Sequence, residues 1–317
     1  MKIYKYTPGN PIDSENTAIA LGFFDGIHLA HRQLLKRTRE IAKKENLVFT
    51  VFTFPSEESF KGEQTLYSTD EKLYILESIG VQAVILADFK SVSQISPEKF
   101  VKNSLIGDMH CRAAVAGYDF RFGKGAVGNA DLLSTLLLSS GAKCFIEDEM
   151  KIGRKKISTT YIKAMLKEGK IEVANKFLGA PYFIKTRVTH GVGLGKKLGF
   201  PTVNTDFKHC SPPLKQGVYR TAVDISGSLY SSLTNVGSCP TFGERDVHAE
   251  TFIIDFSGNL YEEEIRIFFL GYLRDEKRFN SDKELIMQIN VDKMTTIKEN
   301  GELTWQAIGL SSPQQET

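Results

Sequence analysis

Two segments of this 317-residue chain combine glycines with side chains that could handle phosphate. The first runs from Gly22 to His31 and reads GFFDGIHLAH; the second runs from His190 to Asn204 and reads HGVGLGKKLGFPTVN. Glycine lets a backbone approach phosphate closely, and each segment also carries polar side chains suited to a nucleotide. The segments lie about 170 residues apart, a one-domain separation, so the chain is predicted to carry out two sequential nucleotide reactions.

The first segment is predicted to lie between a buried strand and a helix. The run from Thr17 to Phe24 is almost wholly apolar, and a polar helical stretch follows from about His31. Ligands of open α/β sheets bind at the carboxyl ends of strands, where a helix N-terminus offers amide groups to phosphate. His28 and His31 stand three residues apart, so both could stabilise charge that develops on one phosphate. For this pair alone, histidines that only cap a strand–helix corner are the simpler reading.

Two further segments favour a nucleotide site over a purely structural strand–helix corner. Residues Gly117 to Gly125 read GYDFRFGKG and follow another buried run, as expected for a loop that grips a flavin or a nucleotide. Residues 157–163 read ISTTYIK and place hydroxyls at a helix start, followed by a cation. Ser158 or Thr159 could cap the helix while its amides and Lys163 hold phosphates, although an ordinary N-cap explains this segment taken alone.

The second segment joins a glycine-rich turn to the sequence LGFPTVN. The turn has no Walker P-loop pattern, and the alternative to a flap of phosphate-binding amides is a hairpin loop. Pro201 fixes the backbone beyond it. Thr202 and Asn204 then supply a hydroxyl and an amide oxygen, which are hard ligands suited to nucleotide-bound Mg²⁺.

A carboxylate, Glu250, lies in the run HAETFIIDF, which is otherwise largely apolar. Taken alone, it is either an exposed charge on a strand or a general base. As a base it would accept the proton of an attacking hydroxyl group.

The elements that must position these residues change in character along the chain. Residues 1–180 alternate strands and helices, which predicts a parallel sheet with helices on both faces. Beyond about residue 184, period-two alternation of apolar residues and turn residues between the runs predict an antiparallel barrel or sandwich. A closing helix is predicted at 281–294, with Ser281 as N-cap and Glu284 at the capping-box position. The helix at 69–79 is expected to have Ser68 or Thr69 as N-cap and to carry Leu73, Leu76 and Ile79 on one face. The boundary is predicted near Gly179, giving domains 1–180 and 181–317. The expected strands are 17–24, 47–54, 81–87, 113–117, 218–223, 251–256 and 265–269, and the other expected helices are about 31–45 and 96–105.

Composition narrows the class of protein. The net charge of +2 comes from 40 basic and 38 acidic residues, so we expect neither a nucleic-acid partner nor a membrane surface. The four cysteines form no C-x-x-C pair, and they are expected to be reduced thiols of a cytoplasmic protein. The first residues lack the apolar core of a signal peptide, and no stretch is long enough to span a bilayer. The expected partners are therefore small molecules, and the oligomeric state stays open.

Taken together and in this order, the motifs resemble the bacterial bifunctional riboflavin kinase/FAD synthetase family, from about residue 15 to 295. Its amino-terminal domain, an FMN adenylyltransferase of the nucleotidyltransferase superfamily, carries G-x-F-D-G-x-H-x-G-H, T-F-x-P-H-P, G-x-D-F-x-F-G-x and S-S-T-x-I-R. Its riboflavin kinase domain carries G-x-G-x-x-L-G-F-P-T-A-N, G-V-Y, N-I-G-x-R-P-T-F, a strand glutamate and F-L-R-D-E. The matching residues include Asp25, His28, His31, Asp119, Ser158, Thr202, Asn204, Asn235 and Arg274.

The resemblance implies a Rossmann-like domain followed by a small barrel, with riboflavin, FMN and ATP as substrates. Glu250 would activate the ribityl 5′-hydroxyl, Thr202 and Asn204 would help to hold Mg²⁺–ATP, and His28 and His31 would stabilise the adenylyl-transfer transition state. The implied flavin contacts are Asp119, Phe120, Phe122 and Arg274, although Arg274 could instead pair with its neighbours Asp275 or Glu276. The implied nucleotide contacts are Gly22, Phe24, Asp25, Gly26, Ser158, Thr159, Thr160, Lys163, Gly191, Gly193, Gly195 and Lys197.

Three departures from the family pattern fall in the amino-terminal domain. Ala30 stands in place of glycine, Lys163 in place of arginine, and residues 56–58, SEE, in place of P-H-P. An acidic pocket edge would repel triphosphate, so the first alternative is a protein that is mainly a riboflavin kinase. The second alternative is a non-catalytic flavin-binding regulator, possibly of RNA, against which stand the intact kinase residues and the absence of a basic patch.

Overall fold

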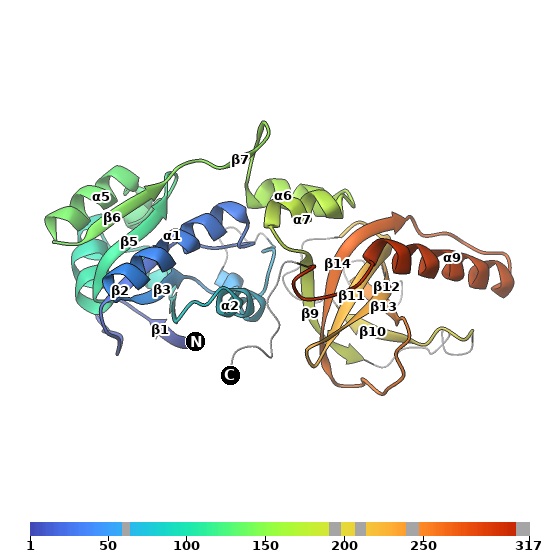
Figure 1. The fold of residues 1–317 in the computed structure, drawn as a ribbon. Coiled ribbons are helices and arrows are strands. Elements are labelled where there is room, and N and C mark those ends of the chain that lie inside the picture. Colours follow the sequence, from blue (N-terminus) through green and yellow to red (C-terminus); the bar gives the residue numbers. More distant parts are fainter. Residues whose placement is uncertain (59–63, 190–197, 207–213, 239–246, 309–317) are drawn as a thin grey trace. The chain divides into compact units, whose positions relative to one another are not determined.

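The computed structural model describes residues 1–58, 64–189, 198–206, 214–238 and 247–308 (Figure 1). The chain divides into two compact units, Met1–Ser158 and Thr159–Thr317, and each is described by itself. Among these described residues, no helix has the length and apolar character needed to cross a membrane.

The first unit is built on a six-stranded sheet in the order β1-β4-β3-β2-β5-β6, with every neighbouring pair parallel. Every residue of β2 is buried, as expected for a parallel strand covered on both faces. This confirms the predicted parallel α/β fold; the edge strands β1 and β6 were not predicted. The strands are β1 (Lys2–Tyr6), β2 (Thr17–Leu21), β3 (Val48–Thr53), β4 (Ala83–Ala87), β5 (Cys111–Gly117) and β6 (Lys143–Glu147).

The order of strands creates a switch point beside β2. The chain passes from β2 to β3 and β4 on one side and returns to β5 on the other side. In open α/β sheets, ligands bind outside the carboxyl ends of the strands at such a point. The loops that leave these ends are residues 22–28 and 118–129, which contain two of the predicted site motifs.

The helices of the first unit follow most of the expected ranges. The predicted helix at 96–105 begins as α4, where the Ser96 hydroxyl accepts a bond from the Lys99 amide, and continues as the π-helix η3. The remaining short elements are a 3₁₀ turn at Ser56–Glu58, another at Lys124–Ala126, and the hairpin strands β7 (Lys151–Ile152) and β8 (Lys155–Lys156). The helices are α1 (Leu29–Glu45), α2 (Thr69–Ser78), α3 (Phe89–Val92), α4 (Pro97–Lys99), η3 (Phe100–Asp108) and α5 (Ala130–Ser139).

Helix α2 differs from expectation in the face it buries. Its N-terminal capping box between Ser68 and Glu71 is formed. Of the three residues expected on one face, Leu76 is buried, whereas Leu73 and Ile79 are only half-buried. Fully buried positions along the helix include Lys72, Ile75 and Leu76. A lysine therefore lies where the apolar pattern alone would place a leucine.

The second unit contains a closed antiparallel barrel, which confirms the predicted barrel with its C-terminal helix. Helices α6 (Thr159–Lys167) and α7 (Ile171–Leu178) precede the barrel, and α9 (Asp282–Asn300) follows it. The predicted cap of α9 is present, since the Ser281 side chain accepts a bond from the Glu284 amide. The barrel order is β10-β13-β12-β11-β14-β9. The strands are β9 (Tyr182–Thr189), β10 (Thr202–Asp206), β11 (Gly217–Ile225), β12 (Ser228–Ser238), β13 (Val247–Ile253) and β14 (Glu264–Arg274).

A buried chain of hydroxyl groups shows which side chains face the barrel interior. Thr221 bonds Ser232 at 2.7 Å and Thr234 at 2.9 Å, and Thr234 bonds Thr251 at 2.9 Å. All four residues are fully buried. Because side chains alternate along a strand, Glu250, which precedes Thr251, lies on the outer face of the barrel.

Candidate active sites

A pocket of about 760 Å³ lies at the carboxyl ends of β2, β3 and β5 in the first unit. Of the predicted site residues, Gly22, His31, Asp119, Phe120 and Phe122 line it. Most of the remaining apolar lining is aromatic, which suits a flat ring system. These additional aromatic residues are Phe23, Phe52, Phe54, Phe89 and Phe100.

The loop from Gly22 to His28 has an unusual backbone. Phe24 and Ile27 have φ angles of 53° and 40°, in the left-handed region, and both side chains are fully buried. A Cβ added to Gly22 would lie 3.1 Å from the Phe24 ring, so glycine is needed for this close packing. Asp25 accepts a hydrogen bond from the Leu66 amide at 2.7 Å. Phe24 and Asp25 therefore fix the shape of the loop, which is typical of strained backbone at functional sites.

His28 and His31 lie together at the start of α1, with their rings stacked at a centroid distance of 3.8 Å. His28 is the N-cap, and its Nδ1 accepts a hydrogen bond from the His31 amide at 3.3 Å. Burial lowers the pKa of His28 to about 4. Burial, His28 and Lys72 together hold the pKa of His31 well below its usual range. Both rings are therefore neutral at pH 7, and the proton of His28 lies on Nε2, where it can be donated.

A lysine that the motif analysis did not single out, Lys156, lies beside these groups. Its Nζ is 3.3 Å from Asp119 Oδ2 and 4.9 Å from the centre of the Tyr118 ring. Asp119 raises and Lys156 lowers the pKa of His28, so both charges act on that imidazole. In the sequence, the only indication that Lys156 could lie at a site is its position two residues before Ser158.

The hydroxyl motif falls at the division between the units. Ser158 is the last residue of the first unit, and Thr159 begins α6 in the second. Thr160 and Lys163 are three residues apart and therefore share a face of α6. Their assignment to nucleotide binding stays a prediction from the sequence, as does that of Gly26 in the first loop.

A second pocket of about 790 Å³ lies in the barrel unit, where Thr202, Glu250 and Arg274 are among its lining residues. Glu250 is directly opposite Asn204 on β10 and opposite Asn235 on β12. Residues directly opposite each other on adjacent strands share one face, so these three side chains form a row across the outer wall of the barrel. Thr202, two residues before Asn204, lies on the same face. The predicted residues Gly191, Gly193, Gly195 and Lys197 lie outside the described part of the chain.

Arg274 is tied to helix α9. Its Nε and Nη2 donate to Asp292 Oδ2 at 3.0 and 2.8 Å, and Gln288 donates to Asp292 Oδ1 at 2.9 Å. The side chains of Arg274 and Asp292 are only 15% and 7% exposed, so this is a largely buried ion pair. The alternative pairing of Arg274 with the side chains of its sequence neighbours is not the arrangement found, although Nη1 donates to the Asp275 carbonyl.

Asn235 and Asp292 are lining residues that the sequence analysis gave no role. Asn235 Nδ2 donates to Glu276 Oε1 at 3.2 Å, whereas its Oδ1 is buried and has no hydrogen-bond partner in the described part of the protein. Asn235 was marked only as a match to the family's N-I-G-x-R-P-T-F motif. Nothing in the sequence distinguishes Asp292 from a solvated acid on a helix.

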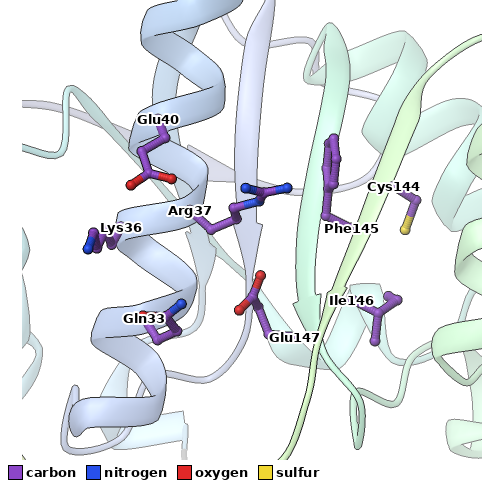
Figure 2. A pocket seen from close by; sticks show the side chains of 8 residues that line it. All are labelled: Gln33, Lys36, Arg37, Glu40, Cys144, Phe145, Ile146 and Glu147. Atoms are coloured by element: carbon purple, nitrogen blue, oxygen red, sulfur yellow. The ribbon is translucent and has the colours of Figure 1, made fainter.

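A third hollow, of about 510 Å³, lies between α1 and the edge strand β6 (Figure 2). Gln33, Lys36, Arg37 and Glu40 project from α1, and Arg37 lies 5.2 Å from the centre of the Phe145 ring. None of the predicted site residues lines this hollow. Predicted site residues instead line each of the other two pockets described above.

Family models match both parts of the chain. The FAD synthetase model matches residues 10–161, and the riboflavin kinase model matches residues 178–299. A bifunctional riboflavin kinase/FMN adenylyltransferase from Bacillus subtilis is 32% identical over 296 residues, covering 90% of this chain and 93% of the relative. A protein of the same name from Buchnera aphidicola is 35% identical over 291 residues, covering 88% and 92%.

A solved structure is similar to this chain over most of its length. It is described as a macrolide-efflux protein from Streptococcus pneumoniae, with a TM-score of 0.83 and 26% identity over 93% of this chain and 99% of that one. The relatives above fix the family more closely, because they exceed 30% identity over about nine-tenths of the chain. The two matched regions also coincide with the two pockets that hold the predicted residues. The chain belongs to the bifunctional riboflavin kinase/FMN adenylyltransferase family.

Proposed function

We propose that this protein makes FAD from riboflavin in two steps. Riboflavin and ATP give FMN and ADP in the barrel, and FMN and ATP then give FAD and pyrophosphate at the parallel sheet. The observation that carries the proposal is that each family-matched region contains a large pocket lined by predicted residues, His31 and Asp119 in the first and Thr202, Glu250 and Arg274 in the second. We assign the adenylyltransferase to residues 1–180 and the kinase to residues 181–317.

In the kinase step, Glu250 is the general base. It accepts the proton of the ribityl 5′-hydroxyl as that oxygen attacks the γ-phosphorus of ATP, and the bond to the β–γ bridging oxygen breaks. Glu250 is exposed on the pocket wall, where a substrate hydroxyl can reach it. Arg274 supplies a cation at the same pocket, held in place by Asp292.

The residues at this pocket fit Mg²⁺ bound to a nucleotide. Thr202 and Asn204 offer a hydroxyl and an amide oxygen on the face that carries Glu250. No group of three His, Cys, Asp or Glu side chains suited to a metal occurs in the described part of the chain. A few neutral protein oxygens suit a Mg²⁺ ion that keeps waters and binds substrate phosphates. When bound, the ion would neutralise charge on the transferring phosphate.

In the adenylyl step, a phosphate oxygen of FMN attacks the α-phosphorus of ATP, and pyrophosphate leaves. No protein base is needed, because the attacking phosphate is already anionic near pH 7. Neutral His28 and His31 donate hydrogen bonds to the developing charge, and the start of α1 offers backbone amides. The aromatic lining of the first pocket accommodates the isoalloxazine ring.

The acidic segment that replaces P-H-P is the specific reason to consider a chain that is mainly a kinase. Glu57 accepts hydrogen bonds from the Thr69 hydroxyl at 2.5 Å and from the Thr69 amide at 3.4 Å. Burial alone would raise the pKa of Glu57, but these bonds and the charge of Lys72 bring it below its usual value. Because the carboxylate is already occupied at the start of α2, we infer that adenylyl transfer is retained.

A product assay tests the proposal. Purified protein is incubated with riboflavin, excess ATP and Mg²⁺, and the flavins are separated by chromatography over time. We expect FMN first and FAD later. FMN alone would leave a kinase, and no turnover at all would remove both assignments. We further propose a cytoplasmic protein that acts on these small molecules.

A further inference from the structure

Lys72 on α2 is a buried lysine to which the reactions above give no role. Its side chain is only 1% exposed. Its Nζ donates one hydrogen bond to the Phe23 carbonyl at 3.1 Å and another to the Phe54 carbonyl at 2.9 Å. A buried ammonium group is costly unless it is hydrogen-bonded and paired with charge, so its presence requires an explanation.

Two carboxylates balance the charge of this lysine from different elements. Burial lowers the pKa of Lys72 to about 8, and Asp25 and Glu57 oppose that shift. Asp25 belongs to the loop after β2, and Glu57 to the turn after β3, where Thr69 holds it. The charge of Lys72 also helps to lower the pKa of His31. The lysine thus lies between two loops that both reach the first pocket.

The two carbonyl groups that Lys72 binds belong to neighbouring walls of that pocket. Phe23 and Phe54 both line it, and their rings are stacked with centroids 6.3 Å apart and planes inclined by 26°. The ammonium group also lies 4.6 Å from the centre of the Phe23 ring. One cation therefore fixes the backbone of both residues and contacts one of the rings.

We propose that Lys72 is a positioning residue for the flavin of the adenylyl-transfer reaction: by tying the backbones of Phe23 and Phe54 together, it fixes the aromatic wall against which the isoalloxazine ring packs. This inference rests on the proposed function of the first pocket. Glu57 then acts as part of the charge balance for Lys72 and not as a group that faces ATP. Glu57, which stands where the family has a histidine, is thereby explained as a charge partner of Lys72.

The test compares two variants of the full chain. Lys72→Met keeps an unbranched side chain of similar length but removes both hydrogen bonds, and Lys90→Met removes an exposed lysine from α3 as a matched control. The KM of FMN and the KM of ATP are each measured in FAD formation. Loss of bonds to a charged group changes binding by roughly tenfold, so the KM of FMN should rise about 10-fold in Lys72→Met. The KM of ATP should stay within about twofold, and Lys90→Met should match the wild type.

The split between the two KM values separates positioning from general damage. A role in stability alone would change both values together or neither. Riboflavin phosphorylation, carried by the other unit, reports whether the chain is folded. An unchanged KM for FMN in folded Lys72→Met, or an equal rise for both substrates, would overturn the proposal.

Two further arms cover failure of the first variant or of the wild type. If Lys72→Met does not fold, Lys72→Gln takes its place, because its amide can still donate to one carbonyl. The KM of FMN should then rise less than expected for Lys72→Met. A wild-type KM of FMN in folded Lys72→Gln would reject the proposal.

If the wild type forms no FAD, the proposed function of the pocket fails separately. Calorimetric titration with FMN needs no turnover. It should then show that one class of FMN site is weaker in Lys72→Met than in the wild type. Equal FMN affinities in the two proteins would overturn the inference.

Discussion

Two neutral histidines lie at the first pocket: His31 lines it, and the His28 ring stacks on His31. A protonated imidazole would supply more charge to phosphate, but His28 is only 6% exposed and His31 is packed against Phe24. Burial therefore keeps both rings uncharged near pH 7. A neutral imidazole still has one N–H to donate, which is the role proposed for both rings in adenylyl transfer.

The low pKa of His28 predicts a stability that depends on pH. The folded state holds a pKa of about 4 against 6.5 for the free side chain, so it excludes a proton that the unfolded chain binds. The contribution of His28 to the free energy of unfolding is complete above pH 6.5 and falls as the pH drops toward 4. At pH 5 the loss from His28 amounts to about 2 kcal/mol.

The variant His28→Asn isolates this effect, because asparagine keeps an N-cap oxygen but does not titrate. Scanning calorimetry at pH 7 and pH 5 should show a smaller drop in melting temperature for the variant than for the wild type. His31, Asp119 and Lys156, the other titratable groups that act on His28, remain in both proteins. Equal drops would mean that His28 is protonated in the folded state.

Glu250 gives the corresponding prediction for the barrel. Glu250→Gln keeps the shape of the side chain but cannot accept a proton, so the rate of FMN formation should fall about 100-fold or more. FAD formation from supplied FMN should be unchanged, because that reaction uses the other pocket. A variant that phosphorylates riboflavin at the wild-type rate would exclude Glu250 as the base.

Motif residues could be predicted from the sequence because their types and spacing are chemically specific. His31, Asp119, Thr202 and Glu250 all line the pockets found. Lys72, Lys156 and Asp292 could not be predicted in the same way. Lys72 and Asp292 are buried charges on helices, which look like solvated ones in the sequence, whereas Lys156 is an exposed hairpin residue whose closeness to Asp119 comes only from tertiary structure.

At the scale of elements, helix α9 is joined to the kinase pocket by polar contacts and by little apolar packing. The only buried side chains described for it are Asp292 and Thr296. Met287, Val291 and Met294 are each more than half exposed. The ion pair between Asp292 and Arg274 therefore fixes the helix to the end of β14.

Breaking this ion pair should loosen the helix and leave Arg274 uncompensated. Removing one partner of a buried pair costs about 3 kcal/mol or more, so Asp292→Ala should lower the free energy of unfolding of the barrel unit by that amount. Trp305 is the only tryptophan of the chain and packs against Phe268 of β14, so its fluorescence reports this transition. Asp292→Ala should also raise the KM of riboflavin.

The exposed Lys283 at the start of the same helix provides the control. Lys283→Gln should change neither the free energy of unfolding by more than about 0.5 kcal/mol nor the KM of riboflavin. If Asp292→Ala behaved like Lys283→Gln, the pair would not anchor the helix.

Elements were predictable where burial leaves a simple pattern. The central strands β2 and β3 are covered on both faces, and their residues, TAIAL and VFTVFT, are apolar apart from β-branched threonines. The edge strands β1 and β6 mix lysines with apolar residues, KIYKY and KCFIE, because part of each meets solvent. The π-helix after Lys99 was also missed, since an apolar pattern does not distinguish i→i+4 from i→i+5 hydrogen bonding.

In the whole molecule, two reactions are assigned to two pockets of one chain, with FMN as the product of one and the substrate of the other. The parallel sheet supplies a switch point with an aromatic pocket, and the barrel supplies an outer wall with an aligned row of polar residues. The order of the two family matches along the chain was predictable from the motifs alone.

Mixing two inactivated variants tests this central claim most directly. His28→Asn should retain the kinase but form FAD about 100-fold more slowly, and Glu250→Gln should retain only FAD formation from FMN. Supplied with riboflavin, ATP and Mg²⁺, neither variant alone should make appreciable FAD, whereas the mixture should make it through FMN released by one and used by the other. If the mixture forms no more FAD than His28→Asn alone, or if Glu250→Gln also fails to convert FMN, the two reactions are not carried by separate sites and the account is contradicted.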